Sequence, residues 1–329
     1  MGGDVVKGNR NPVFDGIRVF SIFGIITSHF LMFGGCGDSY EWLGRYFAGV
    51  FNVVFICLSA VLYGKKWRNT GSKSFTLLSF LYKRWVKIAS SLYPYLCMVM
   101  ITFFVFSVPY NTISFLFNFL GIGWFSKLQY NGHLWFVTMI LICYISIVFV
   151  SRFPNIEKKI IVPFLLIAIF LQFVTDSVGL PGYLFILLAF YVILFLWPLK
   201  NIEQMNGLRK YTLLFVFLLI NGFVIYSLSI GLFKPLSSVS YLLCSLSGYL
   251  WLVVMSLFLN YKTNMFVERI SKLSYEMYLV HHMLCAGPVS IICVTSSSIL
   301  NYVTLIGFTL VLALFLHFLS KRIQQFLVY

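Results

Sequence analysis

The feature that most constrains this chain is a succession of ten apolar runs separated by short polar breaks. Most of the runs approach the roughly 20 apolar residues that one helical crossing of a bilayer needs. Only 10% of the residues are charged and the mean hydropathy is +0.92, which excludes a water-soluble fold. We therefore expect an all-α, polytopic transmembrane helix bundle of about ten spans. The runs cover residues 13–34, 44–64, 88–110, 133–153, 160–176, 180–198, 211–231, 239–260, 275–296 and 299–319.

The fifth and sixth runs are shorter than the others. The alternative for this region is a single helical hairpin, with its turn marked by Asp176 and Pro181. In either case we expect one integral membrane domain over residues 1–329, with tails at 1–12 and 320–329.

The basic residues alternate from loop to loop and so indicate an orientation. Twenty of the 24 Lys and Arg residues fall on one side of the predicted bundle, whereas Arg45, Lys127 and Lys234 fall on the other and Arg18 lies inside the first run. By the positive-inside rule, both termini are expected in the cytoplasm of a multi-pass protein of the cell inner (plasma) membrane. The net charge of +15 then reflects topology, and no nucleic-acid partner is needed to explain it.

The sequence gives little indication of a cleaved signal peptide or of a metal site. The first run is long and carries Asp15 and Arg18, so we expect it to remain as a helix rather than to be cleaved as a signal peptide. The seven cysteines form no CxxC pair and are typical of small apolar packing residues. The five histidines are spread over four runs without metal-ligand spacing, so we expect neither a metal site nor a bound cofactor.

The first run contains Asp15, Arg18 and His29, and a charge at mid-bilayer costs about 2.5–3.5 kcal/mol. Arg18 and His29 are three helical turns apart, so both project from one face, about 16 Å apart along the axis. Asp15 precedes Arg18 by one turn and can pair with it. One interpretation is an interfacial ion pair, with His29 hydrogen-bonded to another helix. The functional interpretation is a shared polar cavity. There, His29 is the general base for a hydroxyl, and Arg18 contacts an anionic donor or a developing oxyanion.

A second polar stripe lies in the segment ISKLSYEMYLVHHMLC. Ser274, Tyr278, His281 and Cys285 share one helix face, and His282 is rotated from it by about 100°. The stripe indicates either interhelical hydrogen bonding or the lining of a cavity. We expect His281 near the middle of its span.

His133 and Trp135 begin the fourth run on its outer side. They are typical of an interfacial belt, and the alternative is that they form a wall of the mouth that faces an acceptor.

The most basic connection precedes the third run. There, Lys83, Arg84 and Lys87 project within about 100° of one another on a helix. Anionic lipid headgroups explain such a cluster at roughly 1 kcal/mol per basic side chain. The alternative is a clamp for the phosphates of a nucleotide-containing donor.

Several of these segments together resemble acyltransferase family 3, a family of integral membrane acyltransferases. FDGIRVFSIFGIITSH is similar to its first-helix signature, and FNVVFICLSAVLYGKKW to its second, with Ala60 where glycine is common after Ser59. FLYKRWVKIASSLYPYL resembles the basic segment, with Lys87 where arginine is usual. GHLWFVTMILICY and KLSYEMYLVHHMLC resemble the later signatures.

The resemblance implies ten transmembrane helices and an acyl-CoA donor used from the cytoplasm. It further implies transfer of an acyl group, most often acetyl, to a sugar hydroxyl of a surface polysaccharide or lipid-linked glycan. In that reading Arg18 and His29 are needed for activity, Lys83, Arg84 and Lys87 bind the donor, and the remaining polar residues line the acceptor cavity. These are His133, Trp135, Ser274, Tyr278, His281 and Ser59.

The chain stops about ten residues after the last run. We therefore expect the short form of the family, without a fused extracytoplasmic hydrolase-like domain, in which the bundle or a separate glycan-synthesis partner completes the transfer.

Two other functions remain open from sequence. A transporter or flippase for a lipid-linked saccharide would be marked by inverted repeats, but the pattern of Asp15, Arg18 and His29 has no second copy in the C-terminal half. A non-catalytic anchor for a glycan-synthesis complex would tolerate replacement of Arg18 and His29 with loss of stability alone.

Overall fold

The computed structural model describes residues 11–71, 76–153, 161–177, 184–196, 206–233, 237–258 and 264–328. Within these residues the chain is helical and contains no β-strand, which confirms the all-α prediction. Pro181, in the predicted turn between the fifth and sixth runs, lies outside the described residues, as do residues 1–10 of the predicted N-terminal tail. The elements are α1 (Pro12–Met32), η1 (Asp38–Tyr40), α2 (Glu41–Thr70), α3 (Leu77–Val105), α4 (Thr112–Phe119), η3 (Gly132–Leu134), α5 (Trp135–Val150), α6 (Ile161–Ser177), α7 (Leu184–Leu196), α8 (Gly207–Ser229), α9 (Ser238–Phe258), α10 (Met265–Cys285) and α11 (Ser298–Val328).

Seven helical segments in the described residues are long and apolar enough to cross a membrane. They are α1, α2, α3, η3 with α5, α8, α9 and α11. Two further apolar helices, α6 and α7, are shorter. The ninth predicted run overlaps α10, which is 21 residues long but carries charged residues such as Glu268 and Lys272. The seven segments support a membrane protein, and each predicted run overlaps one helix.

The predicted span at 275–296 is wrong in its bounds, because α10 starts ten residues earlier and ends at Cys285. The Asn264 side chain caps its N-terminus by accepting a hydrogen bond from the Phe266 amide. Beyond the helix, Gly287 has φ +93° and Pro288 follows, a combination that ends a helix. The hydropathy pattern placed the predicted span too far along the chain, because apolar residues continue after the helix ends. The short helix α4 was not predicted from the sequence.

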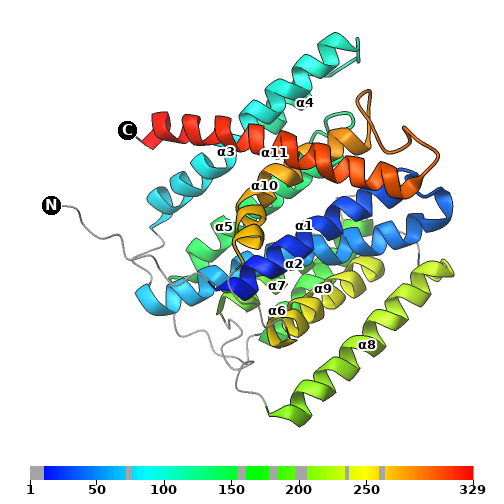
Figure 1. Cartoon of the computed structure of the whole chain (residues 1–329). Coiled ribbons are helices and arrows are strands. Elements are labelled where there is room, and N and C mark those ends of the chain that lie inside the picture. Colours follow the sequence, from blue (N-terminus) through cyan, green and yellow to red (C-terminus); the bar gives the residue numbers. More distant parts are fainter. Residues whose placement is uncertain are drawn as a thin grey trace.

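Helix α2 lies at the centre of the bundle, beside α1 and with α7 and α9 packed against it (Figure 1). Glycines allow the close approaches. A Cβ on Gly44 would lie 2.7 Å from the Ser28 carbonyl oxygen of α1, and one on Gly248 of α9 would lie 2.7 Å from the Val50 carbonyl oxygen of α2. Small residues at such crossings are the usual packing device of membrane helices, where lipid competes for apolar contact.

Gly64 gives the sharpest test of this packing, because a Cβ there would lie 2.3 Å from the Phe195 carbonyl oxygen of α7. Backbone must move to make room, so Gly64→Ala should lower the stability of the bundle by about 1–3 kcal/mol. Gly222→Ala on α8 is the matched control, since a Cβ there meets nothing within 4 Å. Thermal unfolding in detergent should show a lower Tm for Gly64→Ala alone; equal Tm values would contradict the close α2–α7 contact.

The bundle exposes apolar surface along its outer helices. In the most apolar window of α2, 67% of the residues are buried, against 22% in α8 and 28% in α11. In Figure 1, α8 lies at one edge of the bundle and α11 lies with α3 and α4 toward the opposite side. Exposed large side chains such as Phe215 on α8 and Phe315 on α11 are suited to contact with lipid tails. The N-terminal end of α1 and the C-terminal end of α11 point to the same side of the molecule (Figure 1).

Candidate active site

Four of the five histidines meet at one end of the bundle. His29 of α1, His133 of η3, and His281 and His282 of α10 have ring centroids 4.4–6.0 Å apart in the pairs that touch. The exposed fractions are 9% for His29, 3% for His133, 0% for His281 and 5% for His282. We call these four residues the histidine cluster. Residues that are spread over three of the predicted runs are therefore brought together by the fold.

A tight loop brings His133 into the cluster from far along the chain. Tyr130 adopts φ +55°, a left-handed conformation that is costly for a bulky residue. The loop is fixed by Asn131, whose side chain accepts a hydrogen bond from Tyr95 of α3 and donates one to the Gln129 carbonyl. Tyr278 of α10 donates to the His133 carbonyl at 2.5 Å. His133 is thus buried and fixed, which excludes the interfacial-belt interpretation for this residue.

Backbone carbonyls determine which nitrogen of each imidazole carries hydrogen, because a carbonyl oxygen only accepts. Nδ1 of His29 contacts the Ile25 oxygen at 3.0 Å, and Nε2 of His133 contacts the Leu279 oxygen at 3.1 Å. Nδ1 of His281 contacts the Met277 oxygen at 3.2 Å, and Nδ1 of His282 contacts the Tyr130 oxygen at 2.7 Å. A neutral ring in each place therefore keeps its lone pair on the other nitrogen.

Those lone pairs are the chemically useful part of the cluster. His281 Nε2 lies 3.1 Å from His29 Nδ1 and accepts its hydrogen. Nδ1 of His133 is buried without a hydrogen-bond partner. No hydrogen bond from the described residues reaches Nε2 of His29. An imidazole can act as a base when its N–H donates a hydrogen bond and its other nitrogen has a lone pair without a hydrogen-bond partner.

The cluster lies near helix ends rather than at mid-span. His29 is three residues from the end of α1, His281 is four residues from the end of α10, and His133 belongs to η3, which immediately precedes α5. The prediction that His281 lies near the middle of its span is wrong, because α10 extends from Met265 to Cys285. The cluster is thus at the opposite end of α1 from Arg18.

Arg18 and Asp15 form a separate polar group with α10. The Arg18 guanidinium donates to Ser271 Oγ at 3.1 Å and lies 3.6 Å from the Asp15 carboxylate. Ser271 in turn donates to Asp15 at 2.7 Å. The Arg18 side chain remains 27% exposed, whereas that of Asp15 is 9% exposed. Asp15 therefore orients Arg18 toward α10.

Arg18 and His29 do share one face of α1, as predicted, because both contact α10. Ile22 and Ile25, which lie between them on that face, are fully buried. On the facing helix, α10, the Ser274 hydroxyl donates a hydrogen bond to the Ser271 carbonyl at 2.9 Å. The face of α1 between Arg18 and His29 therefore carries isoleucines, whereas the facing part of α10 carries the hydroxyl of Ser274.

The predicted donor-binding residues on α3 separate into two environments. Lys83 and Lys87 are exposed. Arg84 turns inward, donates to Tyr63 Oη at 2.6 Å and lies over the Tyr63 and Phe80 rings. Its Nε atom is buried without a hydrogen-bond partner.

Two other predicted cavity residues contact aromatic side chains away from the imidazole contacts. Ser59 of α2 contacts the Ile56 carbonyl at 2.9 Å and Tyr191 Oη of α7 at 3.3 Å. Trp135 packs edge-to-face against Trp124, with centroids 5.7 Å apart. Of the other predicted members, three come together, namely His133, Tyr278 and His281. His282, which was not among the predicted site residues, joins them. Its only signal was its position beside His281.

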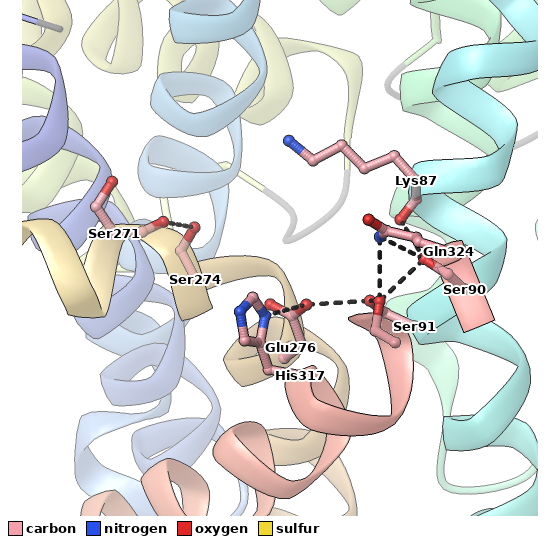
Figure 2. Close-up of polar contacts among 9 residues, drawn as sticks. Lys87, Ser90, Ser91, Ser271, Ser274, Glu276, His317 and Gln324 are labelled. Atoms are coloured by element: carbon pink, nitrogen blue, oxygen red, sulfur yellow. Dashed lines mark hydrogen bonds and ion pairs between the residues drawn. The ribbon is translucent and has the colours of Figure 1, made fainter. Parts of the chain in front are cut away.

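Sequence reasoning also missed a polar cluster between α3, α10 and α11 (Figure 2). Glu276, with a side chain only 7% exposed, accepts from Ser91 at 3.1 Å and contacts Nδ1 of His317 at 3.1 Å. Its second carboxylate oxygen is buried and has no hydrogen-bond partner. Ser90, Ser320 and Gln324 continue the hydrogen bonds along α3 and α11. Figure 2 shows Lys87 extending away from α3 above these serines.

The contact between Glu276 and His317 should be measurable as a coupling energy. Glu276→Ala and His317→Ala should each destabilise the protein, and the double variant should lose less than the sum by about 0.5–2 kcal/mol. Unfolding free energies of the three variants in detergent provide the measurement. Strictly additive losses would mean that the two side chains contribute independently.

No group of three or more His, Cys, Asp or Glu side chains in the described part of the chain has the arrangement of a metal site, and this includes the histidine cluster.

Comparison with known families agrees with the motifs. The model of acyltransferase family 3, described as an acyltransferase domain, matches residues 11–318, nearly the whole chain. The matched residues include Arg18, the histidine cluster, Glu276 and His317. Comparisons with curated proteins and with solved structures gave no match. The chain belongs to acyltransferase family 3 and is a membrane acyltransferase.

Proposed function

We propose that this protein is an O-acyltransferase that moves an acyl group, with acetyl as our first choice, from cytoplasmic acyl-CoA to a sugar hydroxyl. The acceptor we propose is a surface polysaccharide or its lipid-linked precursor. The observation that carries the proposal is the environment of His29, whose Nδ1 hydrogen is committed while no hydrogen bond from the described residues reaches Nε2. This is the arrangement that a general base for a hydroxyl nucleophile requires.

The topology that we propose has ten spans, with both termini in the cytoplasm and the protein in the plasma membrane. The proposal of ten spans counts α6, α7 and α10 as crossings in addition to the seven long apolar segments. The charge asymmetry of the loops supports the orientation. In this orientation Arg18 lies toward the cytoplasm and the histidine cluster toward the outside.

Because Arg18 and His29 are far apart along α1, we propose that they contact different parts of the substrates. Eleven residues of helix span about 16 Å, so the two side chains cannot contact the same carbonyl group. We therefore assign Arg18 to an anionic part of the donor and not to the oxyanion. Lys83, Arg84 and Lys87 are the proposed docking residues for the phosphates of acyl-CoA, with the two exposed lysines as the first contacts.

At the histidine cluster, His29 Nε2 takes the proton of the acceptor hydroxyl as its oxygen attacks the thioester carbonyl. The carbon–sulfur bond breaks, the oxygen ester forms, and the proton taken up by His29 is returned to the CoA thiolate. The acyl end of the donor must therefore reach from the Arg18 end of the bundle to the histidine cluster.

Mass spectrometry of the surface glycan tests the reaction class. Glycan from cells with the intact protein should carry an additional mass of one acyl substituent per modified sugar, compared with cells that lack it. The mass of the difference identifies the acyl group. Identical glycan masses, with the protein present and folded, would contradict the proposal.

A further inference from the structure

The histidine cluster contains one imidazole–imidazole hydrogen bond that the reaction as described does not use. We infer that His281 is the positioning residue for His29, holding its Nδ1 hydrogen and sharing the charge that His29 gains when it takes up a proton. The inference rests on the proposed role of His29 as the base.

The hydrogen-bond geometry gives His281 a single orientation. Its own Nδ1 hydrogen is directed to the Met277 carbonyl at 3.2 Å, so its Nε2 carries a lone pair. That Nε2 faces His29 Nδ1 at 3.1 Å, within normal hydrogen-bond range. His281 is completely buried, so water has no access to take its place. The His29 hydrogen is thus shared between His281 and the Ile25 carbonyl, which lies at 3.0 Å.

The two acceptors differ in what they can do after proton transfer. When His29 Nε2 binds the proton of the hydroxyl, the ring becomes a cation with hydrogen on both nitrogens. The Ile25 carbonyl can only accept a hydrogen bond from this cation. His281 Nε2 can take the Nδ1 proton itself, which leaves His29 neutral with hydrogen on Nε2 and places the charge on His281. No other reactant is needed, and the proton returns along the same bond when the thiolate is protonated.

The other two histidines of the cluster do not make this contact. His282 packs 4.9 Å from His29 between ring centroids, but its Nδ1 is bonded to the Tyr130 carbonyl. His133 stacks on His282 at 4.4 Å, and its Nε2 is bonded to the Leu279 carbonyl. Within the cluster, therefore, the bond to His29 Nδ1 is specific to His281.

Two substitutions separate the bond from the packing. In His281→Gln, the amide oxygen can still accept from His29 Nδ1, whereas His281→Leu retains bulk without an acceptor. We expect kcat for acyl transfer to stay within about 10-fold of the native value for His281→Gln and to fall by about 10²-fold for His281→Leu. The KM for acyl-CoA should change less than about 3-fold in both, because the donor is bound elsewhere. Size-exclusion profiles and Tm values identify any variant that is misfolded.

A second measurement does not depend on activity. Histidine-specific ¹⁵N labelling of the reconstituted protein should show a scalar coupling across the hydrogen bond between His29 Nδ1 and His281 Nε2. The coupling should be lost in His281→Leu and kept in His282→Leu, the matched control on the next residue of α10.

An absent coupling in the native protein, or native kcat in His281→Leu, would overturn the inference. A native protein that shows the coupling but forms no ester would instead contradict the proposed function.

Discussion

Replacing His29 with alanine should lower kcat for acyl transfer by about 10²–10⁴-fold, the usual contribution of a general base. The proposed donor-binding end of the bundle is about three helical turns away, so binding of acyl-CoA should be retained. The measurement is the initial rate of ester formation by reconstituted protein at saturating acyl-CoA, together with equilibrium binding of the donor.

His29→Gln provides the control for packing. Glutamine fills part of the space and keeps hydrogen-bonding groups, but it cannot take up a proton at neutral pH. We expect the same loss of kcat as for His29→Ala, with Tm closer to the native value. If the protein were a non-catalytic anchor, both variants would lower its stability, and acyl transfer would not depend on residue 29. Native kcat in a folded His29→Gln protein would exclude His29 as the base.

Replacing Arg18 should act on the donor and not on the base. Because Arg18 remains 27% exposed beside Ser271 and Asp15, its guanidinium can contact an anionic group that approaches from this end of the bundle. Arg18→Ala should lower kcat/KM for acyl-CoA by about 10²-fold, mostly through a higher KM. Arg18→Lys should lower kcat/KM less, but not restore it fully, because lysine keeps the positive charge and cannot make a bidentate contact. Steady-state kinetics with varied acyl-CoA provides the measurement.

The variant Arg18→Ala also removes the positive charge 3.6 Å from the buried Asp15 carboxylate. Losing one partner of a buried pair is destabilising by itself. The double variant Arg18→Ala with Asp15→Asn removes both charges and should recover Tm without recovering kcat/KM. Recovery of kcat/KM in the double variant would mean that Arg18 serves only to neutralise Asp15.

Local periodicity was sufficient to predict features contained within one helix. The three-turn spacing of Arg18 and His29 predicted a shared face, and both residues contact α10. The hydropathy pattern predicted ten apolar runs, and each of them overlaps a helix. Hydropathy misplaced α10, because Glu268, Arg269 and Lys272 make the first half of the helix polar, whereas apolar residues continue beyond its end.

Contacts between distant segments could not be derived in this way. His133 joins the histidine cluster only because the left-handed Tyr130 and the Tyr95–Asn131 hydrogen bond fix the loop before α5. The Glu276 cluster depends on the mutual packing of α3, α10 and α11, for which no sequence spacing gives a signal. His282 lies 100° from the predicted stripe, but the loop carrying Tyr130 covers that side of α10 as well.

Acyl transfer and saccharide transport can be separated in a single preparation of purified protein in liposomes. Supplied with a lipid-linked glycan acceptor and labelled acyl-CoA, the native protein should place the label on the glycan in an ester linkage, and no glycan product should form without acyl-CoA. If instead the glycan crossed the bilayer without acyl-CoA and no labelled ester appeared, the protein would not be the O-acyltransferase that we propose.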